Sequence, residues 1–108
     1  MIGRIWHGWA TKEKADTYQR VLEEELLPAI RSGTEGFLGV NVLRRDLGEE
    51  VEFLIFTLWE SFDAIATLVG EDYEAAHLPD ETRALLNRFD ERVVHYQVAL
   101  SELADRSS

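Results

Sequence analysis

Three histidines and one arginine are the residues of this sequence whose types and positions are best suited to chemistry. His77 follows Tyr73 by four residues, a spacing that places two side chains on one face of a helix. An imidazole titrates near neutral pH, so beside a phenol it can hold a phenolic substrate and accept its proton. We therefore predict His77 or His7 as a catalytic base. The alternative for His77 is an ordinary surface histidine.

His7, His95 and Arg4 lie on segments that are predicted to be the first and last strands. These strands are neighbours in the expected sheet, so the two imidazoles approach each other if they share a face. No third residue has the spacing of a metal ligand, and no metal site is predicted. Buried structural histidines are the alternative. Arg4, in an otherwise apolar strand, either pairs with a helix carboxylate or binds a carboxylate or enolate of a substrate.

Aromatic residues recur along the predicted strands and would suit a pocket for a flat aromatic ligand between sheet and helices. Trp59, where a strand passes into a helix, is the strongest candidate for a pocket wall. Aromatic residues at strand spacing are also typical of a plain core. With the residues above, the predicted substrate-binding set is Arg4, Trp6, Phe37, Trp59, Tyr73 and His95.

The strands that must position these residues follow from the hydrophobic pattern. Residues 53–59 form the most apolar run of the chain, and both faces of this strand are apolar. Either face could therefore pack on the helices. Further strands are predicted at 2–9, 36–45 and 91–100, and turn-forming residues at 46–49 predict a hairpin.

Three helical segments are expected between these strands. The first carries an apolar stripe of Ala15, Tyr18, Leu22, Leu26 and Ala29. We expect Pro28 to kink this helix, which Thr11 can cap. Ser61 can cap the second helix, and the third is predicted to run from Pro79 to Phe89.

This order of elements predicts an α+β fold, the ferredoxin-like βαββαβ arrangement with a four-stranded antiparallel sheet. Right-handed crossovers place both main helices on one face of the sheet. The other face is also apolar, so we predict a homodimer in which two sheets pack face to face. Residues 1–100 are expected to form the single domain, and residues 101–108 form a polar tail.

Composition limits the classes of partner. The formal net charge of -10 at pH 7 opposes binding to nucleic acid or to an anionic membrane. The sequence has no cysteine, which excludes disulfides and thiolate chemistry. No apolar run approaches the ~20 residues that span a bilayer, and the start lacks the features of a signal peptide. A cytoplasmic location is therefore expected.

Four segments, together with the topology, carry a resemblance to a known family: Ile5-Trp6-His7-Gly8, Gly36-Phe37, Leu58-Trp59-Glu60-Ser61, and Phe89-Asp90-Glu91-Arg92-Val93 leading to His95-Tyr96. Over nearly its whole length the chain resembles the antibiotic biosynthesis monooxygenase family of dimeric α+β barrels. The resemblance implies that fold and a dimer. The scaffold serves quinone-forming monooxygenases without cofactor, heme-degrading enzymes, isomerases and proteins of no known role, so it does not by itself define an activity.

The heme-degrading branch of this superfamily implies a sharper comparison. Its members use an asparagine in the first strand, a tryptophan in the second helix and a later histidine as axial ligand. His77 matches that histidine, whereas residues 1–10 contain no asparagine and Leu68 stands near the position of the tryptophan. Trp59 belongs to the strand junction and does not correspond to it. The resemblance thus implies heme as an alternative ligand, held through His77, without the full set for heme cleavage.

Three functions follow from these observations. The first is a homodimeric monooxygenase without cofactor that oxidises an electron-rich polycyclic phenol to a quinone. The second is a dimeric protein that binds a hydrophobic ligand, heme included, without turnover. In the third, side chains fill the interior and the chain is only a structural dimer.

Overall fold

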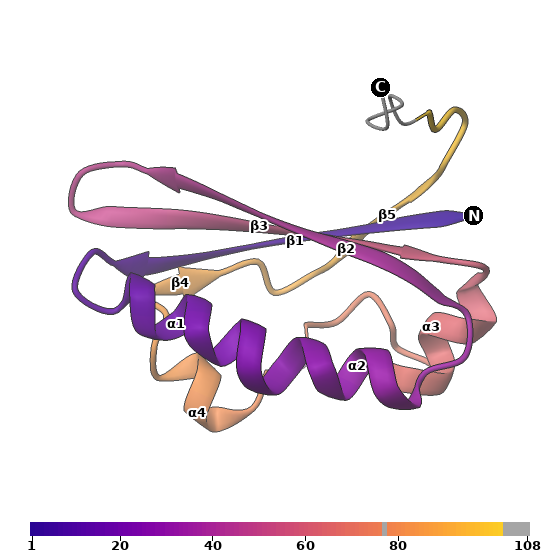
Figure 1. The fold of residues 1–108 in the computed structure, drawn as a ribbon, viewed down its shortest axis with the longest axis horizontal. Coiled ribbons are helices and arrows are strands. Elements are labelled where there is room, and N and C mark those ends of the chain that lie inside the picture. The colour runs from indigo at the N-terminus through magenta and orange to yellow at the C-terminus, as the bar shows by residue number, and fades with distance from the viewer. Residues whose placement is uncertain (77, 103–108) are drawn as a thin grey trace, which may run out of the picture.

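The helices of this protein lie on one face of an antiparallel sheet (Figure 1). The structure is a computed structural model that describes residues 1–76 and 78–102. In chain order its elements are β1 Ile2–Thr11, α1 Ala15–Val21, the π-helical η1 Leu22–Leu26, α2 Leu27–Gly33, β2 Phe37–Asp46, β3 Glu50–Trp59, α3 Phe62–Val69, α4 Asp80–Arg83, β4 Arg88–Phe89 and β5 Val94–Gln97. The predicted α+β, ferredoxin-like fold is confirmed. Among the described residues, no helix has the length and apolar character needed to cross a membrane.

β1 and β3 form the centre of the sheet. They pair along their whole length, with Ile2 opposite Trp59 and Thr11 opposite Glu50. The described strands form a five-stranded sheet in the order β2-β3-β1-β4, and β5 also pairs with β1. The hairpin between β2 and β3 turns at Gly48, whose backbone N–H donates to the Asp46 side chain at 2.9 Å. Within one chain this sheet is open and does not close into a barrel.

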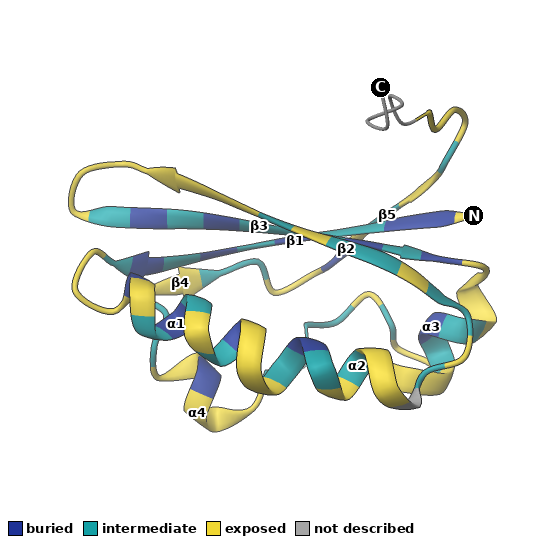
Figure 2. Ribbon diagram, in the orientation of Figure 1, coloured by how far each residue is buried: buried dark blue, intermediate teal, exposed yellow. Residues whose placement is uncertain are grey.

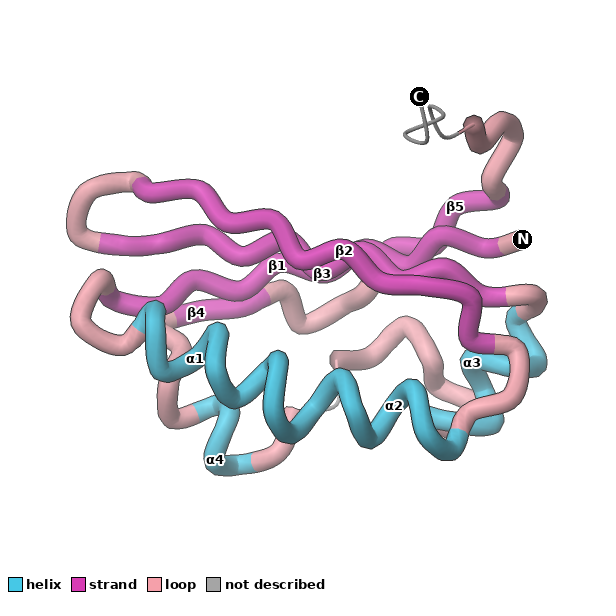
Figure 3. Tube along the Cα trace, viewed as in Figure 1, coloured by secondary structure: helices cyan, strands magenta, loops and turns pink. Residues whose placement is uncertain are grey.

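The C-terminal part of the sheet corrects two predictions. The helix predicted from Pro79 to Phe89 ends at Arg83, and the last two residues of that segment form the strand β4 instead. The strand predicted at 91–100 is limited to β5 (Figure 3). Tertiary hydrogen bonds explain the difference: the Asp90 N–H donates to the His7 carbonyl at 2.9 Å, and the Trp6 indole N–H donates to the Asp90 carbonyl at 2.7 Å. This segment therefore pairs with the free edge of β1. The tertiary hydrogen bonds outweigh the helical periodicity of the segment's sequence.

The long helix is continuous from α1 through η1 to α2 (Figure 1). Pro28 lies in the first turn of α2, directly after the π-helical turn. Proline cannot donate a backbone hydrogen bond, and a wider π turn removes the need for that donor. The expected disturbance therefore takes the form of a π turn before the proline. The Ser61 cap is confirmed, since its hydroxyl accepts from the Ala64 N–H at 3.2 Å.

Burial shows which face of β3 packs on the helices (Figure 2). Phe53, Thr57 and Trp59 are buried beneath the helices, while the alternate residues Leu54, Phe56 and Leu58 face the other side and are half-buried. The core divides into two clusters. One joins Tyr18 and Phe53 near the start of the long helix, and the other joins Trp59 to Ile65 of α3.

Candidate functional site

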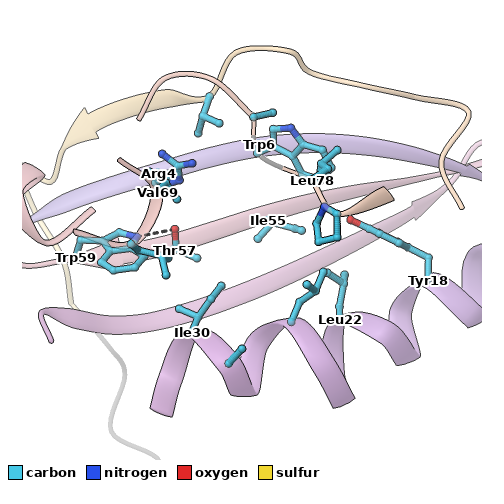
Figure 4. Close-up of a pocket in the computed structure, with 16 residues that line it drawn as sticks. Arg4, Trp6, Tyr18, Leu22, Ile30, Ile55, Thr57, Trp59, Val69 and Leu78 are labelled. Carbon is cyan, nitrogen blue, oxygen red and sulfur yellow. Dashed lines mark hydrogen bonds between the residues drawn. The ribbon is translucent and has the colours of Figure 1, made fainter. Parts of the chain in front are cut away.

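A cavity of about 550 Å³ lies between the helix-facing side of the sheet, the long helix, α3 and the segment before α4 (Figure 4). This volume falls within the ~300–1,000 Å³ of ligand pockets. Most lining side chains are apolar. The polar or aromatic ones that matter for binding are Arg4, Trp6, Tyr18, Thr57 and Trp59. The interior is therefore not filled by its own side chains, as a purely structural dimer would require.

Arg4 brings a positive charge to this apolar cavity. Its Nη1 donates to the Tyr73 carbonyl at 2.6 Å and to His95 Nε2 at 2.9 Å. Both acceptors are neutral, and none of the ion pairs found among residues 1–76 and 78–102 involves Arg4. Burial lowers the pKa of Arg4 from its ordinary value, yet a guanidinium stays charged at neutral pH. A half-buried cation without a carboxylate partner is suited to bind an anionic group of a ligand.

His95 supports Arg4 from the neighbouring strand, because the two residues are directly opposite in the β1–β5 ladder. A guanidinium can only donate, so His95 Nε2 must be unprotonated and accept. Tyr73 packs edge-on against the imidazole, with ring centroids 5.3 Å apart. Burial first, and then the charge of Arg4, lower the pKa of His95, while Glu74 opposes the shift. The imidazole is therefore kept neutral and positions the guanidinium.

This geometry predicts a pH dependence of stability. The folded pKa of His95 lies below its ordinary value of 6.5, so the unfolded chain takes up the proton first as the pH falls. The free energy of unfolding should therefore decrease as the pH drops from about 6.5, and the loss should be complete below the folded pKa. Denaturant unfolding between about pH 8 and pH 5 measures this slope.

His95→Gln is the matched variant, because its amide retains an acceptor for Arg4 but does not titrate. We expect a flatter slope for this variant over the same pH range. Equal slopes in the two proteins would contradict the assignment. Titration of Glu50 does not contribute to the slope in this pH range. The pKa of Glu50 is lowered from 4.5, mainly by the Arg88 hydrogen bond, so its effect on stability falls at lower pH.

Two tryptophans, Trp6 and Trp59, form walls of the cavity. The Trp59 indole N–H donates to the Thr57 hydroxyl at 2.9 Å, which fixes the ring against the sheet. Trp6 is fixed by its hydrogen bond to the Asp90 carbonyl. Phe37 does not line the cavity but packs edge-on against Trp59, with ring centroids 5.3 Å apart. Phe37 and Tyr73 therefore do not line the cavity themselves. Phe37 supports Trp59, and Tyr73 supports Arg4.

The structure does not bring the three histidines together. His7 points to the helix-free face of the sheet, where its Nδ1 lies 2.8 Å from Asp90 Oδ2 and its ring stacks on Trp9. His7 and His95 thus occupy opposite faces and do not approach each other, and the sheet separates His7 from the cavity. His77 lies outside the described residues. Within those residues, no group of three His, Asp or Glu side chains could hold a metal ion.

Tyr18 is a site residue that the sequence analysis assigned only to the apolar stripe of the first helix. Its side chain is fully buried and lines the cavity, and its hydroxyl has no hydrogen-bond partner among residues 1–76 and 78–102. Burial raises the pKa of Tyr18, so the phenol stays protonated. The available signal was a single hydroxyl on an otherwise aliphatic stripe.

Comparisons with solved structures identify similar folds at low sequence identity. A candidate antibiotic biosynthesis monooxygenase from Deinococcus radiodurans has a TM-score of 0.69 and 20% identity, with 97% of this chain and 99% of that chain covered. The monooxygenase from the gene ActVA-Orf6 of Streptomyces coelicolor, in complex with nanaomycin D, has a TM-score of 0.67 and 15% identity, with 96% and 92% covered. The heme-degrader MhuD from Mycobacterium tuberculosis, with two hemes bound, has a TM-score of 0.60 and 21% identity, with 94% and 99% covered.

The family assignment rests on the sequence. A comparison with curated protein sequences finds no significant match. The family model for antibiotic biosynthesis monooxygenase matches residues 1–78, which include β1, the long helix, the β2–β3 hairpin and α3. This part of the chain contributes most of the cavity. The chain therefore belongs to the antibiotic biosynthesis monooxygenase family.

Proposed function

We propose that this protein is a monooxygenase without cofactor that oxidises an electron-rich polycyclic phenol to a quinone. The observation that carries the proposal is the Arg4 guanidinium at the edge of an apolar cavity, whose hydrogen-bond acceptors among the described residues are all neutral. Membership of the family supports the reaction class. The solved complex of the Streptomyces coelicolor monooxygenase with nanaomycin D supports a small organic ligand.

The proposed chemistry depends on ionising the substrate. A positive charge beside a phenolic oxygen lowers the pKa of that phenol, and the apolar walls strengthen the effect by excluding water. The electron-rich ring carbon then bonds to one atom of dioxygen. The resulting peroxide loses water, so a CH₂ group and O₂ yield the quinone carbonyl and H₂O. Arg4 holds the developing anion, and Trp6 and Trp59 hold the rings.

A base must take the first proton from the substrate. His7 lies on the far face of the sheet from the cavity, and His95 directs its Nε2 to Arg4. His77 therefore stays the predicted base. Incubation of the purified protein with an anthrone-type substrate tests the reaction. We expect uptake of one O₂ for each quinone formed, whereas uptake at the background rate would contradict the proposal and favour a binding protein without turnover.

Heme is the alternative ligand, and the described cavity residues fit it only in part. Arg4 could pair with a propionate. No imidazole of the described residues lines the cavity, and the raised pKa of Tyr18 opposes the phenolate that would ligate iron. An axial ligand would have to come from His77. The cavity thus favours an organic anion over heme, and heme binding through His77 stays a prediction.

We also propose that the protein is a homodimer, with the helix-free faces of two sheets packed together. Apolar side chains are spread over this face from β1, β2, β3 and β5, including Ile5, Leu43, Phe56 and Val94. Leu43 is 53% exposed and Val94 48% exposed in the single chain. Exposed apolar side chains gathered on one face of a sheet are typical of an interface.

A charge on this face should separate the subunits. We expect the wild-type protein to sediment as a dimer at micromolar concentration and Phe56→Glu to sediment as a monomer, because the interface would bury an unpaired carboxylate. Leu47→Glu, at an exposed position of the β2–β3 hairpin, is the control and should remain dimeric. A wild-type monomer, or a dimeric Phe56→Glu, would exclude this interface.

A further inference from the structure

The Tyr18 hydroxyl is a buried polar group that the proposed reaction does not use. It belongs to α1, while the Tyr18 ring packs edge-on against Phe53 of β3 with ring centroids 4.9 Å apart. Figure 4 shows the hydroxyl directed from the long helix toward the middle of the cavity. It has no hydrogen-bond partner among residues 1–76 and 78–102.

An unpartnered hydroxyl in this position is unfavourable for folding. A buried polar group that lacks a hydrogen bond loses its interaction with water and gains nothing in exchange. Phenylalanine would make the same ring contact with Phe53 without that penalty. The hydroxyl is therefore best explained by a partner that enters the cavity.

Arg4 and Tyr18 lie at different ends of the cavity (Figure 4). Arg4 is opposite Thr57 on β3, whereas Phe53, which supports Tyr18, is opposite Gly8 of β1. Four residues of strand separate these positions by about 13 Å, and the two long side chains shorten this gap. A ligand of several fused rings is needed to contact both.

Arg4 and Tyr18 favour different chemical groups on a ligand. The guanidinium favours an anion, while the protonated phenol donates a hydrogen bond to a neutral oxygen. Burial keeps that phenol protonated because it raises the pKa of Tyr18. Between them the lining is mostly apolar, with Ile55 and the two tryptophans against the ring system.

We infer that the ligand of this cavity is a fused-ring aromatic anion that also carries a carbonyl oxygen, with its anionic group on Arg4 and its carbonyl on the Tyr18 hydroxyl. The inference rests on the proposed function for the identity of the site and its polycyclic ligand, and it adds a contact to a ring carbonyl and Tyr18 as the residue that makes it. Tyr18 thus acts as a second, neutral contact that distinguishes oxygenated ring systems from plain hydrocarbons with the same charge.

Two probes that differ only in ring carbonyls test this inference. Anthraquinone-2-carboxylate carries them and anthracene-2-carboxylate does not, and the affinity of each is measured by quenching of tryptophan fluorescence. For Tyr18→Phe we expect about fivefold to tenfold weaker binding of the quinone and unchanged binding of the anthracene. Arg4→Met should weaken both probes by more than about tenfold. Tyr96→Phe, exposed on the helix-free face, is the control and should change neither.

The stability of the ligand-free variant provides a second readout. Because the Tyr18 hydroxyl has no partner among the residues that the structure describes, its loss should leave the Tm of Tyr18→Phe equal to or above that of the wild type. A lowered Tm would show that the hydroxyl bonds to the protein and would overturn the inference. Equal weakening of both probes by Tyr18→Phe, or no wild-type binding of the quinone, would also overturn it.

The test of the proposed oxygenase reaction is independent of the test of Tyr18. If oxygen uptake from an anthrone occurs but the probes do not discriminate, the inference about Tyr18 fails and the proposed reaction stands. If the probes discriminate as expected but no oxygen is taken up, the ligand class is supported and the proposed reaction fails.

Discussion

Arg4→Met is expected to lower the rate of quinone formation by about 100-fold or more, the usual effect of removing a donor that stabilises developing negative charge. Methionine retains much of the apolar stem and volume of arginine but removes the cation. The phenol would then ionise against an apolar wall, with no opposite charge nearby. Oxygen uptake and quinone absorbance at saturating substrate measure the effect.

Two control variants separate charge from geometry. Arg4→Lys retains a cation but cannot donate with the same fork geometry, so we expect partial activity. Arg20→Met removes an exposed arginine on α1 and should retain full activity. A fully active Arg4→Met would exclude Arg4 from the reaction.

Arg4→Met also has a signature that does not depend on activity. The charge of Arg4 is one of the causes that lower the pKa of His95. Its removal should therefore raise the pKa of that imidazole, which NMR titration can follow. An unchanged His95 pKa together with lost activity would point to a local rearrangement instead of the loss of the charge.

Trp59→Ala is expected to lower the free energy of unfolding by about 3–5 kcal/mol. The side chain is 1% exposed, packs against Phe37 and connects the sheet to Ile65 of α3. Its removal would leave a void next to the existing cavity and would leave the Thr57 hydroxyl without its donor. Since a small domain is stable by only ~5–15 kcal/mol, the variant should be close to unfolding at room temperature.

Denaturant unfolding followed by circular dichroism measures this loss. Trp59→Phe is the matched control, because it retains an aromatic ring against Phe37 and should lose clearly less. If Trp59→Ala lost less than about 1 kcal/mol, the cavity wall would be able to collapse around the missing ring, contrary to the rigid packing described above.

Sequence alone determined the fold, because the signals that carry it are local. The apolar alternation of residues 53–59, the stripe from Ala15 to Ala29 and the Ser61 cap each depend on neighbours a few residues away. Their order leaves the ferredoxin-like topology as the arrangement that buries the apolar stripe. The family followed from the same segments. Three residues that line the cavity, Arg4, Trp6 and Trp59, also stand out within their own strands in the sequence.

Only the tertiary structure decided which face of each strand is buried and how the C-terminal segment pairs, because both depend on contacts between distant parts of the chain. Both faces of β3 are apolar, so only its packing on the long helix showed that Phe53 and Trp59 face the helices. The formation of β4 at the end of the predicted third helix reflects hydrogen bonds from the edge of β1.

The pairing of Arg4 with His95 joins residues 91 positions apart through strand register. That the Tyr18 hydroxyl has no hydrogen-bond partner among the described residues follows only from the packing of the long helix on the sheet. Sequence thus specified which side chains are present on each element, whereas the register and packing of those elements determined which of them face one another in the cavity.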